Sequence, residues 1–231
     1  MNKNTAILIF ANSAKQESSD KRFTNSEALF EALNKQTIAK VKRSGLPYFH
    51  FSEKEQQGAS FGERYTNAIQ FVYDQGFDNI ITIGNDTPHL QTSQLVKTAQ
   101  ALETNPIVLG PSRDGGYYLM GLHKSQFNTE TFLKLPWQTS QLTQSISRLL
   151  SAKKINVVFL QVLQDIDSVS DVKVLIDSFR KFSEKINALL LSIITSEKSI
   201  VQKIYFLLPS FQKENYFNKG SPLQLHFKPF I

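Results

Sequence analysis

Apolar runs of strand length alternate with longer stretches of helical period along this sequence, from residue 5 to about residue 181. This alternation is typical of βα units, in which the strands form a largely parallel sheet with helices packed on it. The expected strands are residues 6–10, 46–51, 79–83, 107–110, 117–122 and 155–160. The pattern predicts an α/β fold and excludes an all-helical or all-β domain.

Between the strands, residues 27–41, 64–74 and 95–102 each carry one apolar stripe at helical spacing. A further helix is expected after Ser168, which stands three residues before Asp171 as in a capping box. Residues 184–208 carry a wide stripe that Glu197 and Lys198 interrupt, which favours two helices. We therefore predict a domain at residues 1–181 and a helical C-terminal extension with an aromatic tail at residues 182–231, through which the chain forms a homodimer.

Composition limits the class of protein. The 231 residues, 41% of them apolar, suffice for one compact domain and an appendage. The absence of cysteine excludes disulfides, zinc–thiolate sites and thiol nucleophiles, and it favours a cytoplasmic location. The net charge of +6 comes from scattered basic residues, so no nucleic acid partner is expected. The apolar run at residues 6–11 is too short to cross a bilayer, so no transmembrane segment is expected.

Three acidic clusters follow expected strands. The first is GNDTP at residues 84–88, which delivers Asp86 to the carboxyl end of a strand, where ligands bind in open α/β sheets. From these residues alone, an Asx turn before Pro88 is the favoured role of Asp86.

The second cluster is GPSRDGGYY at residues 110–118, where two glycines let the backbone approach a ligand and hold Asp114 at the rim. A plain hairpin with Asp-Gly in its turn is the alternative. The third is QDIDS at residues 164–168, in which Asp165 and Asp167 lie on the same side of an extended segment. They suit a divalent cation when another Asp faces them, or they favour the following helix N-terminus.

The order of these clusters carries a family resemblance. FGER at residues 61–64, GNDTPHL at 84–90, GPSRDGGYYLMGL at 110–122, WQT at 137–139 and DIDS at 165–168 together resemble the bacterial DUF2064 family. This is a glycosyltransferase-like family related to the cofactor nucleotidyltransferases of the nucleotide-diphospho-sugar transferase (GT-A) fold. The resemblance covers residues 5–180 and implies a three-layer α/β/α sandwich with a mostly parallel sheet, followed by the helical extension.

By the same resemblance, Asp86 holds a metal ion, Mg or Mn, on the nucleotide diphosphate, and Asp167 completes the metal site. Asp114 falls in the acceptor-side loop as the catalytic residue, which orients or deprotonates the acceptor. The remaining residues expected at the acceptor side of the cleft are Gly115, Gly116, Tyr117, Trp137 and Thr139. Gln138 stands where the family has a small residue.

The implied function is a glycosyltransferase that binds a nucleotide or nucleotide sugar with a divalent metal and transfers the sugar to an acceptor. The alternatives are a nucleotidyltransferase acting on a phosphorylated cofactor precursor and a non-catalytic binding domain of the same fold. The departure from the family lies at residues 11–23, which lack the usual glycine and proline and carry Glu17 and Asp20. We expect a loop here in which Lys21 and Arg22 keep the cationic role toward nucleotide phosphates.

Overall fold

The computed structural model describes residues 4–177 and 182–207, the last ten of these by their backbone alone. The strands are β1 (Thr5–Phe10), β2 (Tyr48–Phe51), β3 (Asn79–Ile83), β4 (Ile107–Pro111), β5 (Tyr117–His123) and β6 (Val157–Phe159). The helices are α1 (Ala14–Asp20), α2 (Ser26–Ser44), α3 (Phe61–Asp74), α4 (Thr92–Ala101), η1 (Lys124–Gln126), α5 (Thr129–Leu133), α6 (Leu142–Ala152), α7 (Val169–Ile176) and α8 (Glu184–Leu207). Every predicted strand is confirmed to within two residues at each end.

The six strands form one sheet in the order β2-β1-β3-β5-β4-β6. Neighbouring strands run parallel except at β5, which is antiparallel to both β3 and β4. The predicted α/β fold with a mostly parallel sheet is therefore confirmed. Because β5 is reversed, the turn between β4 and β5 lies at the same edge of the sheet as the carboxyl ends of β1 and β3.

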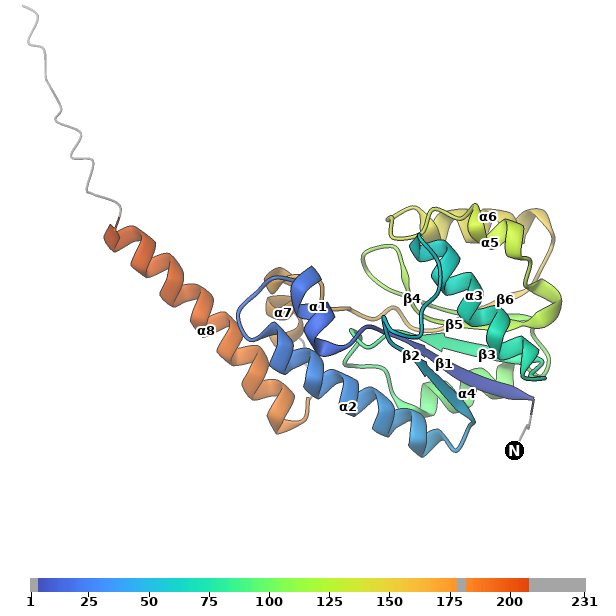
Figure 1. Cartoon of the computed structure of the whole chain (residues 1–231), viewed down its shortest axis with the longest axis horizontal. Coiled ribbons are helices and arrows are strands. Elements are labelled where there is room, and N and C mark those ends of the chain that lie inside the picture. Colours follow the sequence, from blue (N-terminus) through green and yellow to red (C-terminus); the bar gives the residue numbers. More distant parts are fainter. Residues whose placement is uncertain (1–3, 178–181, 208–231) are drawn as a thin grey trace, which may run out of the picture.

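Alternating side chains of the strands fill two separate cores. Leu8 of β1 and Ile80 of β3 pack with α3, α5 and α6, whereas Ile7 and Ile81 pack with α2 and α4. Figure 1 shows these two groups of helices on opposite faces of the sheet. This is the three-layer sandwich that the resemblance implies, and the period of two along each strand produces it.

A third core lies beside the sandwich, where α8 packs on α2 and α7 through Ile186, Leu190 and Ile193. The prediction of two helices in this stretch is wrong, because α8 continues unbroken through Glu197 and Lys198. Both residues have good helix propensity and neither removes a backbone donor, so nothing local ends the helix. In Figure 1 the second half of α8 extends away from the domain. The predicted aromatic tail at residues 208–231 lies outside the described residues.

The structure also corrects the expectation of a loop at residues 11–23. Residues Ala14–Asp20 form helix α1, and the Ser13 hydroxyl caps it by accepting a hydrogen bond from the Gln16 amide at 3.3 Å. The sequence signal was weak because this short helix is mostly polar and carries no apolar stripe. Its packing on α2 compensates for this, since short helices depend on tertiary contacts.

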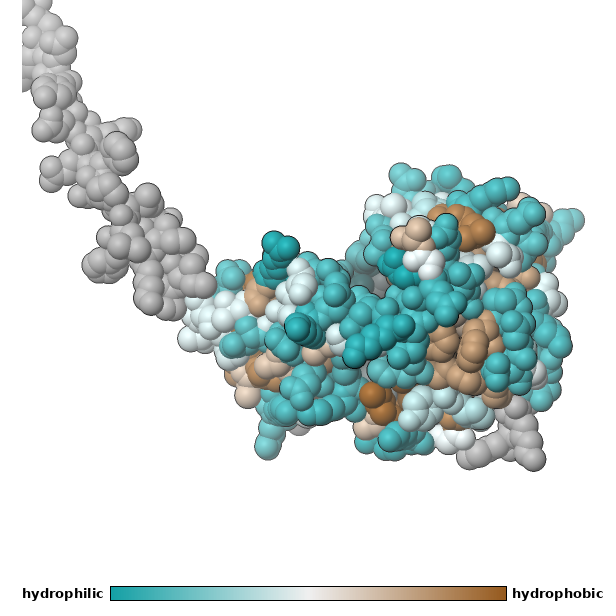
Figure 2. All heavy atoms as spheres, viewed as in Figure 1, coloured by the Kyte–Doolittle hydropathy of each residue, from teal (hydrophilic) through white to brown (hydrophobic). Residues whose placement is uncertain are grey.

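The described helices include none with the length and apolar composition required to span a membrane. The face of the molecule drawn in Figure 2 is mainly hydrophilic, with hydrophobic side chains gathered only in small patches.

Candidate functional site

A cleft of about 500 Å³ opens at the edge of the sheet where β1 and β3 end and the turn between β4 and β5 lies. Its acidic lining residues are Glu17, Asp20, Asp86, Asp114, Asp165 and Asp167, and its basic ones are Lys21 and Arg64. Six carboxyl groups against two cations give the cleft an excess of four acidic groups. The three clusters recognised in the sequence therefore meet in one place, as sheet topology predicts for strand ends.

Asp86 follows β3 in a loop whose backbone is held from two sides. The Asn85 side-chain amide donates to the Asn34 side-chain oxygen of α2 at 2.8 Å. The Ile166 amide donates to the Asp86 carbonyl at 3.0 Å. The second bond joins the Asp86 loop directly to the segment that carries Asp165 and Asp167.

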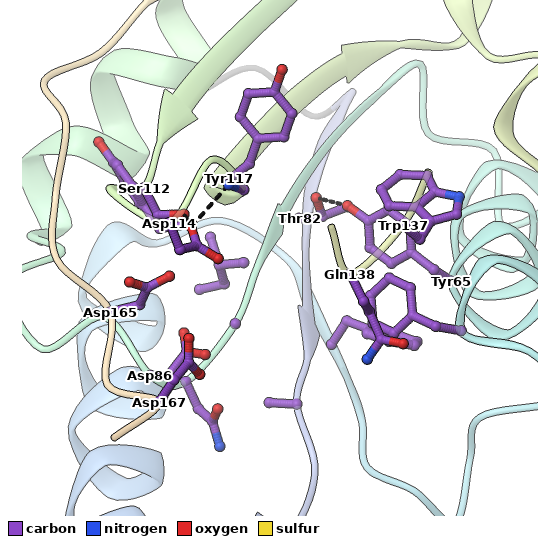
Figure 3. A pocket seen from close by; sticks show the side chains of 18 of the residues that line it. Tyr65, Thr82, Asp86, Ser112, Asp114, Tyr117, Trp137, Gln138, Asp165 and Asp167 are labelled. Atoms are coloured by element: carbon purple, nitrogen blue, oxygen red, sulfur yellow. Dashed lines mark hydrogen bonds between the residues drawn. The ribbon is translucent and has the colours of Figure 1, made fainter. Parts of the chain in front are cut away.

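Asp114 lies in the tight turn between β4 and β5. The Gly116 amide donates to Asp114 Oδ1 at 2.8 Å, and the Ser112 hydroxyl donates to the same oxygen. Gly115 has φ of 95°, and a Cβ atom there would overlap the Ser140 carbonyl, so the turn requires glycine. The turn thus fixes the carboxylate through one oxygen and leaves it exposed at the rim of the cleft, where Figure 3 shows it.

Asp165 and Asp167 come from the extended segment that precedes α7. One carboxylate oxygen from each of Asp114, Asp165 and Asp167 lies within 4.8 Å of the others. Burial raises the pKa of Asp165 to about 7, and the nearby carboxylates of Asp86, Asp114 and Asp167 add to this. A buried carboxyl group surrounded by like charge is the environment that a divalent cation relieves, and its oxygens suit Mg or Mn.

The sequence paired Asp86 with Asp167 as metal ligands, and the structure brings both into the cleft but groups Asp167 with Asp114 and Asp165. The signal for Asp165 was its alternation with Asp167. The intervening Ile166 is fully buried in the third core, which turns the two carboxylates to the opposite side.

Lys21, at the C-terminal end of α1, lies between the carboxylates of Asp86 and Asp167. Its Nζ is 3.0 Å from Asp86 Oδ2, 2.8 Å from Asp167 Oδ1 and 3.6 Å from Glu17 Oε2. It also donates to the Ile166 carbonyl at 3.0 Å. Burial lowers the pKa of Lys21, but the surrounding carboxylates outweigh this and raise it. The ammonium group is a fixed positive charge inside the acidic cluster.

Glu17 was expected on a loop at residues 11–23. In the structure it is a buried residue of α1, and burial, opposed by Lys21, raises its pKa to about 7. Arg22 is exposed and donates from Nε to the Ser19 carbonyl at 3.0 Å, outside the residues that line the cleft. Of the two expected cations, Lys21 alone is among the lining residues.

The opposite wall of the cleft is aromatic, as Figure 3 shows for Tyr65 and Trp137. Their ring centroids are 4.9 Å apart with an edge-on geometry, and Phe61 stacks on Tyr65 at 5.6 Å. Trp137 Nε1 donates to the Phe132 carbonyl at 2.6 Å. A Cβ atom at Gly62 would come 2.7 Å from the Trp137 ring, so this glycine permits the indole to pack on α3.

The remaining expected residues surround these walls. Gly116, Tyr117 and Thr139 line the cleft, whereas Gly115 is part of the turn behind them. The Tyr117 hydroxyl donates to the Thr143 carbonyl at 3.2 Å, and the Thr139 hydroxyl donates to the Pro136 carbonyl at 2.8 Å. Gln138 is exposed in the cleft lining with φ of 58°, a conformation that small residues adopt more readily.

The sheet with one reversed strand and an acidic cleft at its edge belongs to the nucleotide-diphospho-sugar transferase fold. A protein of Desulfovibrio desulfuricans G20 described as a "putative nucleotide-diphospho-sugar transferase" superposes with a TM-score of 0.71 and 22% identity. The match covers 88% of this chain and 98% of that protein. At this identity the similarity establishes the fold. Residues 28–139 match the family model described as "Uncharacterized protein conserved in bacteria (DUF2064)", the family that the sequence motifs resemble.

Two weaker structural matches have TM-scores below 0.5. Rv0371C of Mycobacterium tuberculosis H37Rv in complex with manganese gives 0.45 at 14% identity, covering 76% of this chain and 99% of that protein. The 4-diphosphocytidyl-2C-methyl-D-erythritol synthase of Anaerococcus prevotii gives 0.46 at 13% identity, covering 81% and 96%. Neither similarity bears on the function of this chain. None of the curated proteins is similar enough in sequence to match it.

Proposed function

We propose that this protein is a glycosyltransferase that uses a nucleoside diphosphate sugar together with Mg or Mn. The observation that carries the proposal is the meeting of Asp114, Asp165 and Asp167 within one cleft, with Asp86 beside them. Three carboxylate oxygens, one from the turn between β4 and β5 and two from the segment before α7, form a set that hard divalent cations prefer. We place the protein in the cytoplasm, with residues 1–181 as the transferase domain, and residues 182–231 as the extension through which it forms a homodimer.

The charge of the cleft supports a cation-dependent anionic substrate. With an excess of four acidic groups, the cleft repels a diphosphate unless a cation enters with it. Asp114, Asp165 and Asp167 would hold that ion, and when bound it supplies charge neutralisation for the leaving diphosphate. A triphosphate brings about two more negative charges than a sugar diphosphate, so this cleft favours the sugar nucleotide.

The chain's own residues then divide the remaining work. Lys21 neutralises Asp86 and Asp167 and lies where it can also meet a phosphate oxygen. Asp114 is anchored through Oδ1 at the rim, and from there its carboxylate would orient the acceptor hydroxyl beside the ion. The aromatic wall of Phe61, Tyr65 and Trp137 supplies a stacking surface for a ring of the substrate.

The test is turnover of a panel of sugar nucleotides and nucleoside triphosphates, each with Mg, Mn or EDTA. We expect release of a nucleoside diphosphate from one sugar nucleotide, dependent on metal and lost in Asp165→Asn. Asp74→Asn, an exposed carboxylate on α3, is the matched control and should leave turnover unchanged. Release of pyrophosphate would instead identify a nucleotidyltransferase. Binding without turnover under all conditions would identify a non-catalytic domain and contradict the proposal.

A further inference from the structure

Lys40, near the C-terminal end of α2, carries a buried ammonium group that contacts the loop of Asp86. Its exposed fraction is 8%. Its Nζ donates to the Pro88 carbonyl at 2.7 Å and to the Gln36 side-chain oxygen at 2.8 Å. Among the described residues no carboxylate lies within 4.0 Å of it, so both of these partners are neutral.

A buried ammonium group with only neutral partners lowers the stability of the folded state. A buried charge without a counter-ion loses its hydration, and two neutral acceptors return only part of that free energy. Burial and the neighbouring Arg43 lower the pKa of Lys40 to about 8. An apolar side chain of the same length would serve packing at lower cost, so packing does not account for a lysine here.

The hydrogen bonds of α2 show that the Lys40 ammonium group helps to hold the loop that carries Asp86. Before Asp86 in the chain, Asn34 accepts a hydrogen bond from the Asn85 side chain. After Asp86, Lys40 donates a hydrogen bond to the Pro88 carbonyl. The Thr92 hydroxyl donates to the Lys40 carbonyl at 3.1 Å, which ties the start of α4 to the same point. Helix α2 therefore hydrogen-bonds the Asp86 loop at two points, one on each side of Asp86.

The Asp86 loop is in turn hydrogen-bonded to the segment that carries Asp165 and Asp167. The Asp86 carbonyl accepts the Ile166 amide at 3.0 Å, and Ile166 stands between Asp165 and Asp167. A shift of the loop therefore shifts the backbone that carries two of the three clustered carboxylates. Partners one step behind metal ligands commonly change metal affinity by about 10- to 100-fold when removed.

We propose that Lys40 is a positioning residue, which together with Asn34 clamps the Asp86 loop and through it sets the spacing of the carboxylates in the cleft. The expected effect on metal affinity rests on the proposed function above. The clamp, meaning the hydrogen bonds by which Lys40 and Asn34 hold the Asp86 loop, does not depend on that function.

The test compares Lys40→Met with Lys42→Met, which removes an exposed lysine from the same helix. Amide hydrogen exchange resolved by residue is followed at Leu90, which bonds the Thr87 carbonyl, and at Ile166, which bonds the Asp86 carbonyl. In Lys40→Met we expect both amides to exchange about 10-fold faster while the melting temperature stays equal or rises. Lys42→Met should change neither. Asn34→Ala removes the contact on the other side of the loop and should also speed exchange of the Ile166 amide. This variant replaces Lys40→Met in the test if Lys40→Met does not fold.

Titration with Mn separates the two proposals. We expect Lys40→Met to bind Mn about 10-fold more weakly than the unmodified protein. If the unmodified protein binds no Mn but the exchange effects occur, the clamp stands and the metal-dependent function fails. Unchanged exchange at Leu90 and Ile166, or uniformly faster exchange with a lower melting temperature, would overturn the clamp.

Discussion

The two walls of the cleft are built in opposite ways. The aromatic wall of Phe61, Tyr65 and Trp137 is continuous with the core above the sheet. The acidic wall gathers Asp86, Asp114, Asp165 and Asp167 from three segments and places the buried Asp165 beside three other carboxylates. One wall stabilises the fold, and the other reduces its stability. Groups retained against their effect on stability are the better indicators of function.

The largest expected effect concerns the aromatic wall. Trp137→Ala should lower the free energy of unfolding by about 3 kcal/mol, because it removes ring contacts with Phe61, Tyr65 and Phe132 and a hydrogen bond. Urea denaturation measures this. Phe71→Ala, which truncates a side chain that is 42% exposed, is the control and should cost much less. Equal losses in the two variants would show that the aromatic wall is not part of the core.

A smaller loss is expected for the one cation inside the acidic wall. Lys21→Met should cost about 2 kcal/mol at pH 7.5, because it leaves Glu17, Asp86 and Asp167 without their shared partner. The pKa of Lys21 is raised, so the ammonium group stays charged and its contribution is not lost by deprotonation below about pH 10. Below pH 7 the loss should shrink as Glu17 takes up a proton.

Chemical denaturation at pH 5 and pH 7.5 tests the Lys21 prediction. Lys15→Met removes an exposed lysine from the same helix and should have little effect at either pH. A loss that is the same at both values would contradict the role given to Glu17.

The smallest expected effect has the opposite sign. Asp165→Asn should raise the stability of the metal-free protein at pH 8 by about 1.5 kcal/mol, because it removes a buried carboxylate repelled by its neighbours. Burial and the neighbouring carboxylates raise the pKa of Asp165 in the folded state to about 7, from its ordinary value of 3.8. The folded state therefore holds a proton that the unfolded state releases, and this stability is lost as the pH rises from about 4 to 7.

Thermal melts across this pH range, with and without Mn, measure both effects. In the unmodified protein Mn should restore stability most strongly above pH 7, where Asp165 is ionised. Asp165→Asn should gain nothing from Mn, whereas Asp177→Asn, an exposed carboxylate just after α7, should behave as the unmodified protein. Equal stabilisation of both variants by Mn would place the ion elsewhere.

The sequence by itself determined most of the secondary structure. Residues 79–83 form β3 as predicted, because a short isoleucine-rich run, NIITI, is a local signal for a strand buried on both faces. The capping box at Ser168 likewise begins α7 where expected. Local patterns failed where packing decided the outcome, at the polar helix α1 and in the uninterrupted α8.

The grouping of the charged side chains was decided by the tertiary structure. Spacing along the chain brought Asp165 and Asp167 to one side of a segment, but the partner that joins them, Asp114, depends on the reversed strand β5 and the turn before it. The positions of Lys21 and Lys40 depend on how α1 and α2 pack beside the Asp86 loop. Secondary structure follows from periods of a few residues. These contacts join residues as far apart as Lys21 and Asp167, and they exist only once the sheet has formed.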